Sequence, residues 1–190
     1  MEKALWKAGN MLYPLPAVMV SCGRKDEKPN IITVAWTGTI CTNPPMVYIS
    51  LRPSRLSYDI IKETKEFVIN LATEKLARAV DYCGVKSGRD VDKFKEMKLT
   101  PKSASFVKAP MIMESPVNIE CRVNQILELG SHHMFIAQVL GVHVDTSYLN
   151  ENGKFDLSLS NPIVYSHGEY FGLGELMGKF GYSVKKKKPV

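Results

Sequence analysis

The chain has 190 residues, which suits one domain with a buried core, or one domain with a small appendage. Apolar residues make up 45% of the sequence, yet no run approaches the roughly 20 that a membrane-crossing helix needs, so we expect no membrane partner. The amino end lacks the long apolar stretch of a secretory signal, which favours a cytoplasmic protein.

The net charge of +6 is concentrated at the carboxyl end. Four consecutive lysines, Lys185–Lys188, contribute to it, and taking four from +6 leaves +2 for the rest of the chain. Such a tail is either solvated or a contact for nucleic acid or an anionic membrane. Because no helix-turn-helix, RNA-binding aromatic motif or zinc knuckle accompanies it, we expect a solvated basic tail over 181–190 and no nucleic-acid partner.

The four cysteines, Cys22, Cys41, Cys83 and Cys121, are far apart in the sequence and form no C-x-x-C pair. Structural zinc sites and thioredoxin-type dithiols normally use such close pairs. We therefore expect no metal site, and we expect reduced cysteines that pack as small apolar residues.

Short strands and helices alternate in the first half of the chain. Apolar alternation and β-branched residues predict strands over 17–22, 31–37, 46–51 and 66–71. Turns are expected over 23–30 and at Asn43-Pro44-Pro45. One helix should begin with Ser54 as its N-cap, and another should run from Thr73 to about Tyr82.

Long strands dominate the second half. Residues 85–110 are polar and irregular, with one short helical turn expected among them. Strands are predicted over 117–129 and 132–145, joined by a tight hairpin at Gly130-Ser131, and a further strand over 162–165. Many strands with short turns and few helices predict a mainly β fold, a Greek-key-like antiparallel barrel, in one domain over residues 1–180.

Glycine-rich nucleotide-binding motifs of the Rossmann and P-loop types are absent, so a phosphate-bearing cofactor would need side chains and loop amides. The segment from Ser50 to Tyr58 offers both, because it runs from a strand end into a helix start, where free amides and the helix dipole attract anions. Two arginines and three serine hydroxyls within it add donors that suit phosphate. The alternative is an ordinary capped helix with solvated arginines.

A second segment, 32–39, suits a flat ring system. Such a ring needs small residues for close approach, backbone groups at its polar edge and an aromatic wall. Ala35, Trp36, Thr37 and Gly38 provide these elements in one run. The alternative is a half-buried strand whose tryptophan packs in the core.

Two histidines, His132 and His133, follow the predicted hairpin. Alternation along a strand points them to opposite faces, so one can face a cleft while the other faces solvent. A histidine in a cleft can donate a proton or orient a reduced cofactor, because its pKa lies near neutrality. Ordinary surface histidines are the alternative. We expect His143 to be structural, and His167 is a weaker cleft candidate.

Several motifs follow one another in a specific order between residues 10 and 175. They are Asn30-x-x-Thr33-x-Ala35-Trp36, Asn43-Pro44-Pro45, Arg52-x-Ser54-Arg55-x-Ser57-x-x-Ile60-Ile61, Phe67-Val68-Ile69-Asn70, Ser87-Gly88-Arg89-Asp90-x-Asp92-Lys93-Phe94 and Gly130-Ser131-His132. In this order and spacing they resemble the flavin reductase-like family that binds flavin mononucleotide (FMN), specifically its flavoredoxin-type branch. The resemblance implies a split-barrel fold and a homodimer with each flavin near the subunit interface.

The resemblance also implies roles for individual residues. Those expected to line the flavin ring are Ala35, Trp36, Thr37 and Gly38. Those expected around the ribityl phosphate are Ser50, Leu51, Arg52, Ser54, Arg55 and Ser57, with Thr33, Arg89 and Lys93 as further cofactor contacts. His132 matches a histidine near the nicotinamide site of many relatives, although Ser131 and Ala137 stand where those relatives carry aspartate and glycine.

We therefore expect an FMN-dependent oxidoreductase that takes hydride from NADH or NADPH and passes electrons to free flavin, ferric complexes or a partner protein. One alternative is a flavoredoxin-like FMN electron carrier without NAD(P)H activity of its own. Another, from a different class, is a non-catalytic binding protein that has lost the cofactor. The presence of Arg52, Ser54 and Arg55 argues against that last alternative.

Overall fold

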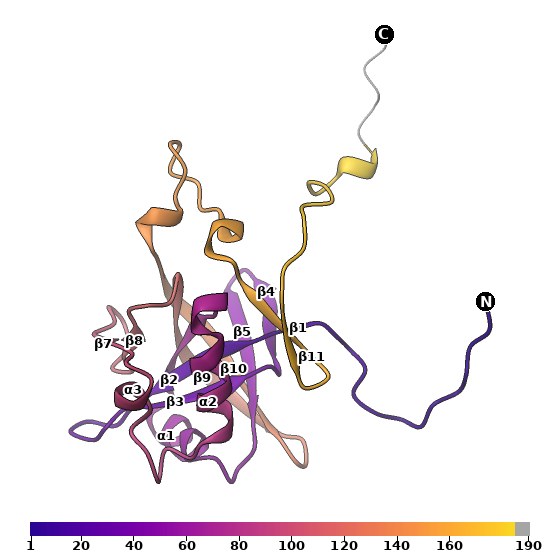
Figure 1. Cartoon of the computed structure of the whole chain (residues 1–190). Helices are drawn as coiled ribbons and strands as arrows, with labels where there is room; N and C mark the ends of the chain where they lie inside the picture. The colour runs from indigo at the N-terminus through magenta and orange to yellow at the C-terminus, as the bar shows by residue number, and fades with distance from the viewer. Residues whose placement is uncertain (185–190) are drawn as a thin grey trace.

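The computed structural model describes residues 1–184 and is built around one seven-stranded sheet (Figure 1). The sheet runs β3-β2-β6-β9-β10-β5-β4, every neighbouring pair is antiparallel, and it curls into a half-barrel. Its strands are β2 (Val18–Cys22), β3 (Asn30–Val34), β4 (Thr37–Thr42), β5 (Pro45–Leu51), β6 (Glu66–Leu71), β9 (Val117–Glu128) and β10 (His133–Val144). The split antiparallel barrel predicted from the sequence is confirmed.

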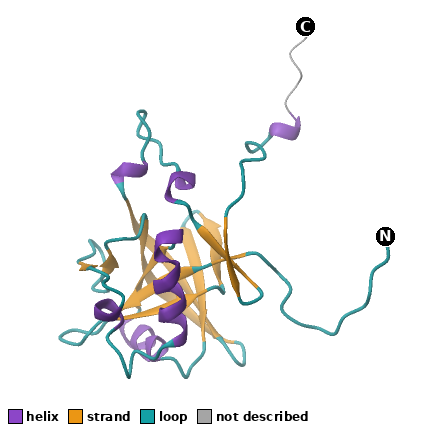
Figure 2. Cartoon of the chain, viewed as in Figure 1, coloured by secondary structure: helices purple, strands orange, loops and turns teal. Residues whose placement is uncertain are grey.

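Smaller elements surround this sheet (Figure 2). The α-helices are α1 (Leu56–Thr64), α2 (Ala77–Val85) and α3 (Lys93–Glu96). In one small sheet β11 (Ile163–Ser166) lies between β1 (Leu15–Pro16) and β12 (Glu169–Gly172). In the other, β7 (Pro101–Lys102) pairs with β8 (Met111–Ile112). Short 3-10 turns lie at η1 (Glu74–Leu76), η2 (Thr146–Tyr148), η3 (Leu157–Ser160) and η4 (Tyr182–Val184). None of the helices within residues 1–184 has the length and apolar character needed to cross a bilayer.

The sheet is buried on both faces at β2, because successive side chains enter two different cores. Val18 and Val20 join the core inside the half-barrel, which also contains Phe67 and Phe135. Met19, on the opposite face, joins the core beneath α2 and α3. Every residue of β2 is therefore buried, the pattern expected of a strand covered on both sides.

The predicted strand over 31–37 is wrong at its end, and the error concerns the site. β2 begins at Val18, which pairs with Val34, so β3 has no partner beyond that residue. The chain bends at Ala35 and Trp36 and enters β4 at Thr37. Because β3 and β4 are the two edge strands of the curled sheet, this bend connects its two edges, and Trp36 lies in the bend.

The helix after β5 also begins differently from the prediction. Ser54 does not cap it; Arg55 occupies the N-cap position, and no side chain accepts a hydrogen bond from the first turn. A turn in which the Arg55 amide donates to the Arg52 carbonyl (3.1 Å) leads into the helix. The amino end of α1 is therefore left with uncapped amides, which is the arrangement that favours an anion.

Other parts of the chain follow the prediction more loosely. The helix expected from Thr73 to about Tyr82 starts as the 3-10 turn η1 and continues as α2 to Val85. The β11–β12 hairpin replaces the single strand expected over 162–165. Cys22, Cys83 and Cys121 are buried thiols, Cys41 is half-buried, and all four are free.

Buried Glu120 organises part of the irregular region 85–110. Its carboxylate accepts the amide hydrogens of Ser105, Phe106 and Val107 at 2.9, 2.5 and 3.0 Å. His143 Nε2 lies 2.6 Å from the same carboxylate, in keeping with the structural role expected for that histidine. These bonds lower the pKa of Glu120 against the opposing effect of burial.

Candidate flavin site

Two cavities adjoin each other where α1 begins, beside the bend between β3 and β4. The smaller has a volume of about 210 Å³ and is lined mostly by polar and cationic residues. The larger has a volume of about 740 Å³ and is lined by aromatic, small and cationic residues. Ile32 and Arg55 line both cavities, so the two lie next to each other.

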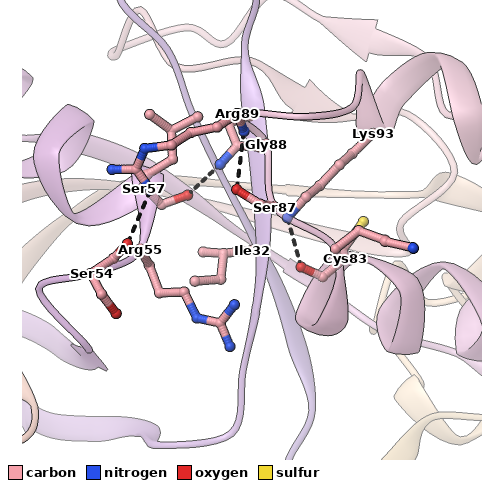
Figure 3. Close-up of a pocket in the computed structure, with 12 residues that line it drawn as sticks. Ile32, Ser54, Arg55, Ser57, Cys83, Ser87, Gly88, Arg89 and Lys93 are labelled. Atoms are coloured by element: carbon pink, nitrogen blue, oxygen red, sulfur yellow. Dashed lines mark hydrogen bonds between the residues drawn. The ribbon is translucent and has the colours of Figure 1, made fainter.

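The smaller cavity lies between the start of α1 and the loop that follows α2 (Figure 3). Arg89, from that loop, donates to the Ser54 carbonyl and to the Asp59 carboxylate, both at 3.0 Å. Ser57 is buried, and its hydroxyl accepts a hydrogen bond from the Asn30 amide at 2.9 Å. These bonds hold the two walls of the cavity at a fixed separation.

Lys93 is a buried cation in the wall of the smaller cavity. Its Nζ donates to the carbonyls of Ile31 (2.7 Å) and Cys83 (2.8 Å), which accounts for two of its three N–H groups. Burial lowers the pKa of Lys93, because the low-dielectric surroundings disfavour the charged form. A dianionic group in the cavity would offset that cost.

Gly88 is needed for the same wall. A Cβ atom at this position would lie 2.1 Å from Asn30 Oδ1, which is the side chain that bonds Ser57. Any larger residue would therefore displace the Asn30–Ser57 pair. The Ser87-Gly88-Arg89 run closes the smaller cavity because its backbone can approach β3 this closely.

The larger cavity has an aromatic wall. The Trp36 ring stacks with the His132 ring at a centroid distance of 5.9 Å and an interplanar angle of 9°. Tyr165 lies 6.5 Å from Trp36, and Tyr170 lies 5.8 Å from Tyr165. Trp36 remains 36% exposed, so one part of this wall is open.

His132 lies in the turn before β10, and not in the strand that was predicted to begin there. Its Nδ1 is 3.0 Å from the Ser131 hydroxyl. The pKa of His132 is lowered, mainly by burial and to a smaller extent by the positive charge of Arg52. His133 points elsewhere and lies 2.8 Å from the Tyr58 hydroxyl. The two histidines thus diverge, and His132 is the one that lines the cavity.

The structure brings most of the sequence-predicted site residues together. The larger cavity is lined by Thr33, Ala35, Trp36, Ser50, Leu51, Arg52, Arg55 and His132. The smaller cavity is lined by Ser54, Arg55, Ser57, Arg89 and Lys93. Ser50, Leu51 and Arg52 line the larger cavity and not the smaller one, and their contact with the ribityl phosphate stays a prediction.

Two predicted residues lie outside both cavities. The Thr37 side chain is buried and donates to the Tyr48 carbonyl at 2.6 Å. Gly38 faces the Tyr48 ring, and a Cβ there would lie 3.1 Å from it. Because β4 starts immediately after the bend, these residues belong to the sheet, and their contact with the flavin ring stays a prediction.

Sequence reasoning missed one wall of the larger cavity. Asn10 near the amino end, Asp81 in α2, and Tyr165 and Tyr170 in the β11–β12 hairpin all line it. A tyrosine in a predicted strand does not indicate a binding site, because tyrosines in strands are equally common in hydrophobic cores. Ser87 and Gly88 line the smaller cavity and were present in a quoted motif, although no role was assigned to them.

Comparison with known proteins identifies this arrangement. Residues 10–174 match the family model described as a flavin reductase like domain. The chain belongs to the flavin reductase-like family. Its structure resembles flavoredoxin of Desulfovibrio vulgaris (Miyazaki F), with 34% identity, a TM-score of 0.90, and coverage of 97% of this chain and 100% of that one.

Two further relatives support the assignment. Flavoredoxin from Methanosarcina acetivorans is 27% identical with a TM-score of 0.86, covering 97% of this chain and 100% of that one. A protein of Archaeoglobus fulgidus is 32% identical over 160 residues, which is 84% of this chain and 88% of that protein. The flavoredoxin-type assignment made from the motifs is confirmed, and with it a flavin cofactor and a flavin-linked redox function.

The residues that line the two cavities fit a flavin with a phosphorylated side chain. Arg55, Arg89 and Lys93 offer positive charge around a cavity large enough for one phosphate, at the uncapped start of α1. The adjoining cavity offers aromatic and small residues for a flat ring. Polar and aromatic ends thus lie in the order that a ring with a phosphorylated side chain requires.

Proposed function

We propose that this protein is an FMN-dependent oxidoreductase that takes hydride from NADH or NADPH and passes electrons to free flavin, ferric complexes or a partner protein. The observation that carries the proposal is that the small cationic cavity and the large aromatic one lie next to each other and share Ile32 and Arg55. The flavin, when bound, supplies the capacity to accept hydride and release electrons. The chain supplies binding, orientation and control of protons.

The smaller cavity favours FMN over a dinucleotide flavin. Its volume of about 210 Å³ and the hydrogen-bond donors in its wall suit a terminal monophosphate. Arg55 lies at the boundary of both cavities, which suits contact with the phosphate and the sugar-like chain together. The uncapped first turn of α1 adds backbone donors on the same side.

His132 is proposed to hold a proton next to the ring. Its lowered pKa keeps the imidazole neutral at pH 7, because burial and the charge of Arg52 both disfavour the protonated form. The Ser131 hydroxyl engages Nδ1, so Nε2 is the nitrogen left to donate or accept a proton in the cavity. Trp36, stacked on His132, restricts the orientation of that imidazole.

A second candidate function is electron transfer by a flavoredoxin-like carrier that uses no nicotinamide. The similarity to two flavoredoxins favours it. So does Ser131, which stands where the resemblance leads us to expect an aspartate beside the nicotinamide. For both functions we propose a homodimer and a single domain over residues 1–180. The cytoplasmic location of the protein stays a prediction. The four lysines of the proposed tail lie outside the described residues.

The test begins with the absorption spectrum of the purified protein, before and after addition of FMN. A yellow protein that retains FMN on gel filtration supports the proposal, and one that stays colourless contradicts it. Anaerobic stopped-flow mixing with NADH and then NADPH separates the two candidates. Rapid bleaching of the flavin supports the enzyme, whereas a flavin that is bleached only by dithionite supports the carrier.

A further inference from the structure

A third cavity lies away from the flavin site, between the turn that joins β2 to β3 and the segment 101–110, which includes β7 and leads to β8. Its volume is about 510 Å³, and it shares no lining residue with either flavin cavity. Figure 1 places β7 and β8 on the opposite side of the molecule from β11, whose Tyr165 lines the larger flavin cavity. The proposed flavin chemistry leaves this third cavity without a role.

The lining of the third cavity is cationic and apolar, and it includes no acidic residue. Its cations are Arg24 and Lys25 from the turn, and Lys102 and Lys108 from the facing segment. Apart from one serine, the other lining residues are proline, alanine and valine, and Val107 among them is buried in a small core beneath the segment. A cleft lined by one sign of charge concentrates counter-ions of the opposite sign.

The lysines of this cavity differ from Arg24, whose charge is already matched. Arg24 bonds the Glu63 carboxylate at 2.6 Å and the Glu27 carboxylate at 3.3 Å, so these two acids are engaged. Within residues 1–184, the lysines that form no ion pair include Lys25, Lys102 and Lys108. Three unmatched positive charges therefore line one cavity, and their mutual repulsion favours a bound anion.

The segment that carries Lys108 is fixed through its backbone. The Glu66 carboxylate accepts the Lys108 amide hydrogen at 2.8 Å, and the Ser21 hydroxyl donates to the Pro110 carbonyl at 2.5 Å. Buried Glu120 binds three further amides of the same segment. This wall of the cavity is thus held in place before any ligand binds, which lowers the entropic cost of binding.

We propose that the third cavity binds a small organic anion that carries at least two negative charges beside an apolar part. The three unmatched ammonium groups call for more than one negative charge, and the proline, alanine and valine lining favours a ligand that is not purely ionic. The volume of about 510 Å³ lies within the roughly 300–1,000 Å³ typical of small-molecule sites. Because no lining residue is shared with the flavin cavities, this binding does not depend on the flavin.

The test is isothermal titration calorimetry of the full-length protein saturated with FMN, which keeps the probe out of the flavin cavities. The probe is naphthalene disulfonate, which has a flat apolar body and two negative charges, and inorganic sulfate supplies charge without the apolar body. The cavity variant carries Lys102→Gln and Lys108→Gln. The control variant carries Lys75→Gln and Lys154→Gln, which remove the same charge from exposed lysines outside all three cavities.

We expect one bound probe per chain in the wild type and the control. The cavity variant should bind the probe at least about tenfold more weakly, because it has lost two of the three unmatched charges. Sulfate should bind the wild type at least about tenfold more weakly than the probe, because it lacks the apolar body. Added salt should weaken probe binding, since the lysines are exposed. Unchanged circular dichroism and FMN affinity in both variants would show that the fold and the flavin cavities are intact.

Several results would overturn the inference. A wild type that binds no probe removes the site, and a cavity variant that binds as tightly as the control places the probe elsewhere. Sulfate that binds as tightly as the probe would make the cavity a site for inorganic anions and contradict the apolar part of the ligand. A protein that binds no FMN contradicts the proposed function, whereas the comparison of the cavity variant with the control still decides whether the third cavity binds the probe.

Discussion

The two cavities of the site are built in opposite ways. In the smaller one, side chains are fixed by hydrogen bonds of 2.7–3.0 Å, from Asn30 to Ser57, from Arg89 to Ser54 and from Lys93 to two carbonyls. In the larger one, rings lie against one another and Trp36 remains partly exposed. One cavity is polar and rigid, and the other is aromatic and open on one side.

This difference suggests a division of work. Preorganised donors lose little entropy on binding, so the smaller cavity suits a group that stays bound through many turnovers. The larger cavity, with about 740 Å³, has room for a flat ring and for part of a second ligand beside it. Binding strength is therefore expected to reside in the first cavity, and reactivity in the second.

The largest expected effect comes from Arg55→Ala. The guanidinium has no hydrogen-bond partner within residues 1–184, and its loss would remove a charge-assisted bond to phosphate worth about 2 kcal/mol. FMN affinity should fall by roughly 30-fold, whereas the affinity for riboflavin, which lacks the phosphate, should change by less than about twofold. Fluorescence titration with both flavins measures this.

Arg122→Ala is the matched control for that change. Arg122 is an exposed arginine of β9 that bonds the Glu66 carboxylate at 3.2 Å and lines neither cavity. Both affinities should stay at the wild-type values. If Arg55→Ala weakened FMN and riboflavin equally, the separation of a phosphate cavity from a ring cavity would be wrong.

The next effect is on the reaction, through His132→Gln. Loss of a positioned proton donor or acceptor should lower the rate of flavin reduction by NAD(P)H at least about tenfold, with little change in FMN affinity. Because the pKa of His132 is lowered, the neutral form dominates at pH 7, and the wild-type rate should fall only as the pH drops below the ordinary histidine value of 6.5. The rate of the His132→Gln variant should not show this fall at low pH (the acid limb of the pH profile).

Arg52 offers a sharper version of the same test. Its charge is one cause of the lowered pKa of His132, so Arg52→Ala should raise that pKa and move the acid limb toward higher pH. Stopped-flow rates measured across the acid range would show it. If the fall in rate at low pH were unchanged in both variants, a group other than His132 would be responsible for it.

A smaller effect is expected from Trp36→Ala. Loss of one aromatic contact is worth about 1 kcal/mol, so FMN and riboflavin should both bind roughly fivefold more weakly. Equal loss for the two flavins is the signature that separates this variant from Arg55→Ala. Trp36→Phe, which retains a ring, should recover part of the affinity; a loss confined to FMN would put Trp36 beside the phosphate instead.

The sequence predicted the polar half of the site better than the aromatic half, and the reason is physical. Arg55 and Ser57 occur in one short motif at the start of α1, and Arg89 and Lys93 occur in another, so each pair can be recognised from a local pattern. Tyr165 and Tyr170 lie on β11 and β12, and this hairpin is joined to the rest of the chain by the pairing of β1 with β11, a contact between distant parts of the chain. No local pattern could have placed that hairpin against Trp36.

The fold shows the same contrast. Apolar patterns and β-branched residues indicated every strand of the large sheet except β4, which was not predicted. In β5 every second residue is buried, whereas β2 is buried along its whole length. The end of β3 was misplaced because residues 35–37 have good strand propensity, and only the absence of a partner for β3 beyond Val34 ends the strand. Tertiary pairing, and not local propensity, decided where Trp36 lies.

The smallest effect on the site is expected from Thr37→Val, which tests its boundary. The hydroxyl donates to the Tyr48 carbonyl at 2.6 Å within the sheet, so its loss should cost about 1 kcal/mol of stability, or about 2–4 °C in the melting temperature. FMN affinity should stay at the wild-type value, since Thr37 lines neither cavity. Thr37→Ser, which keeps the hydroxyl, should recover most of the stability. A variant that melts normally but binds FMN more weakly would return Thr37 to the ring wall and move the edge of the larger cavity into β4.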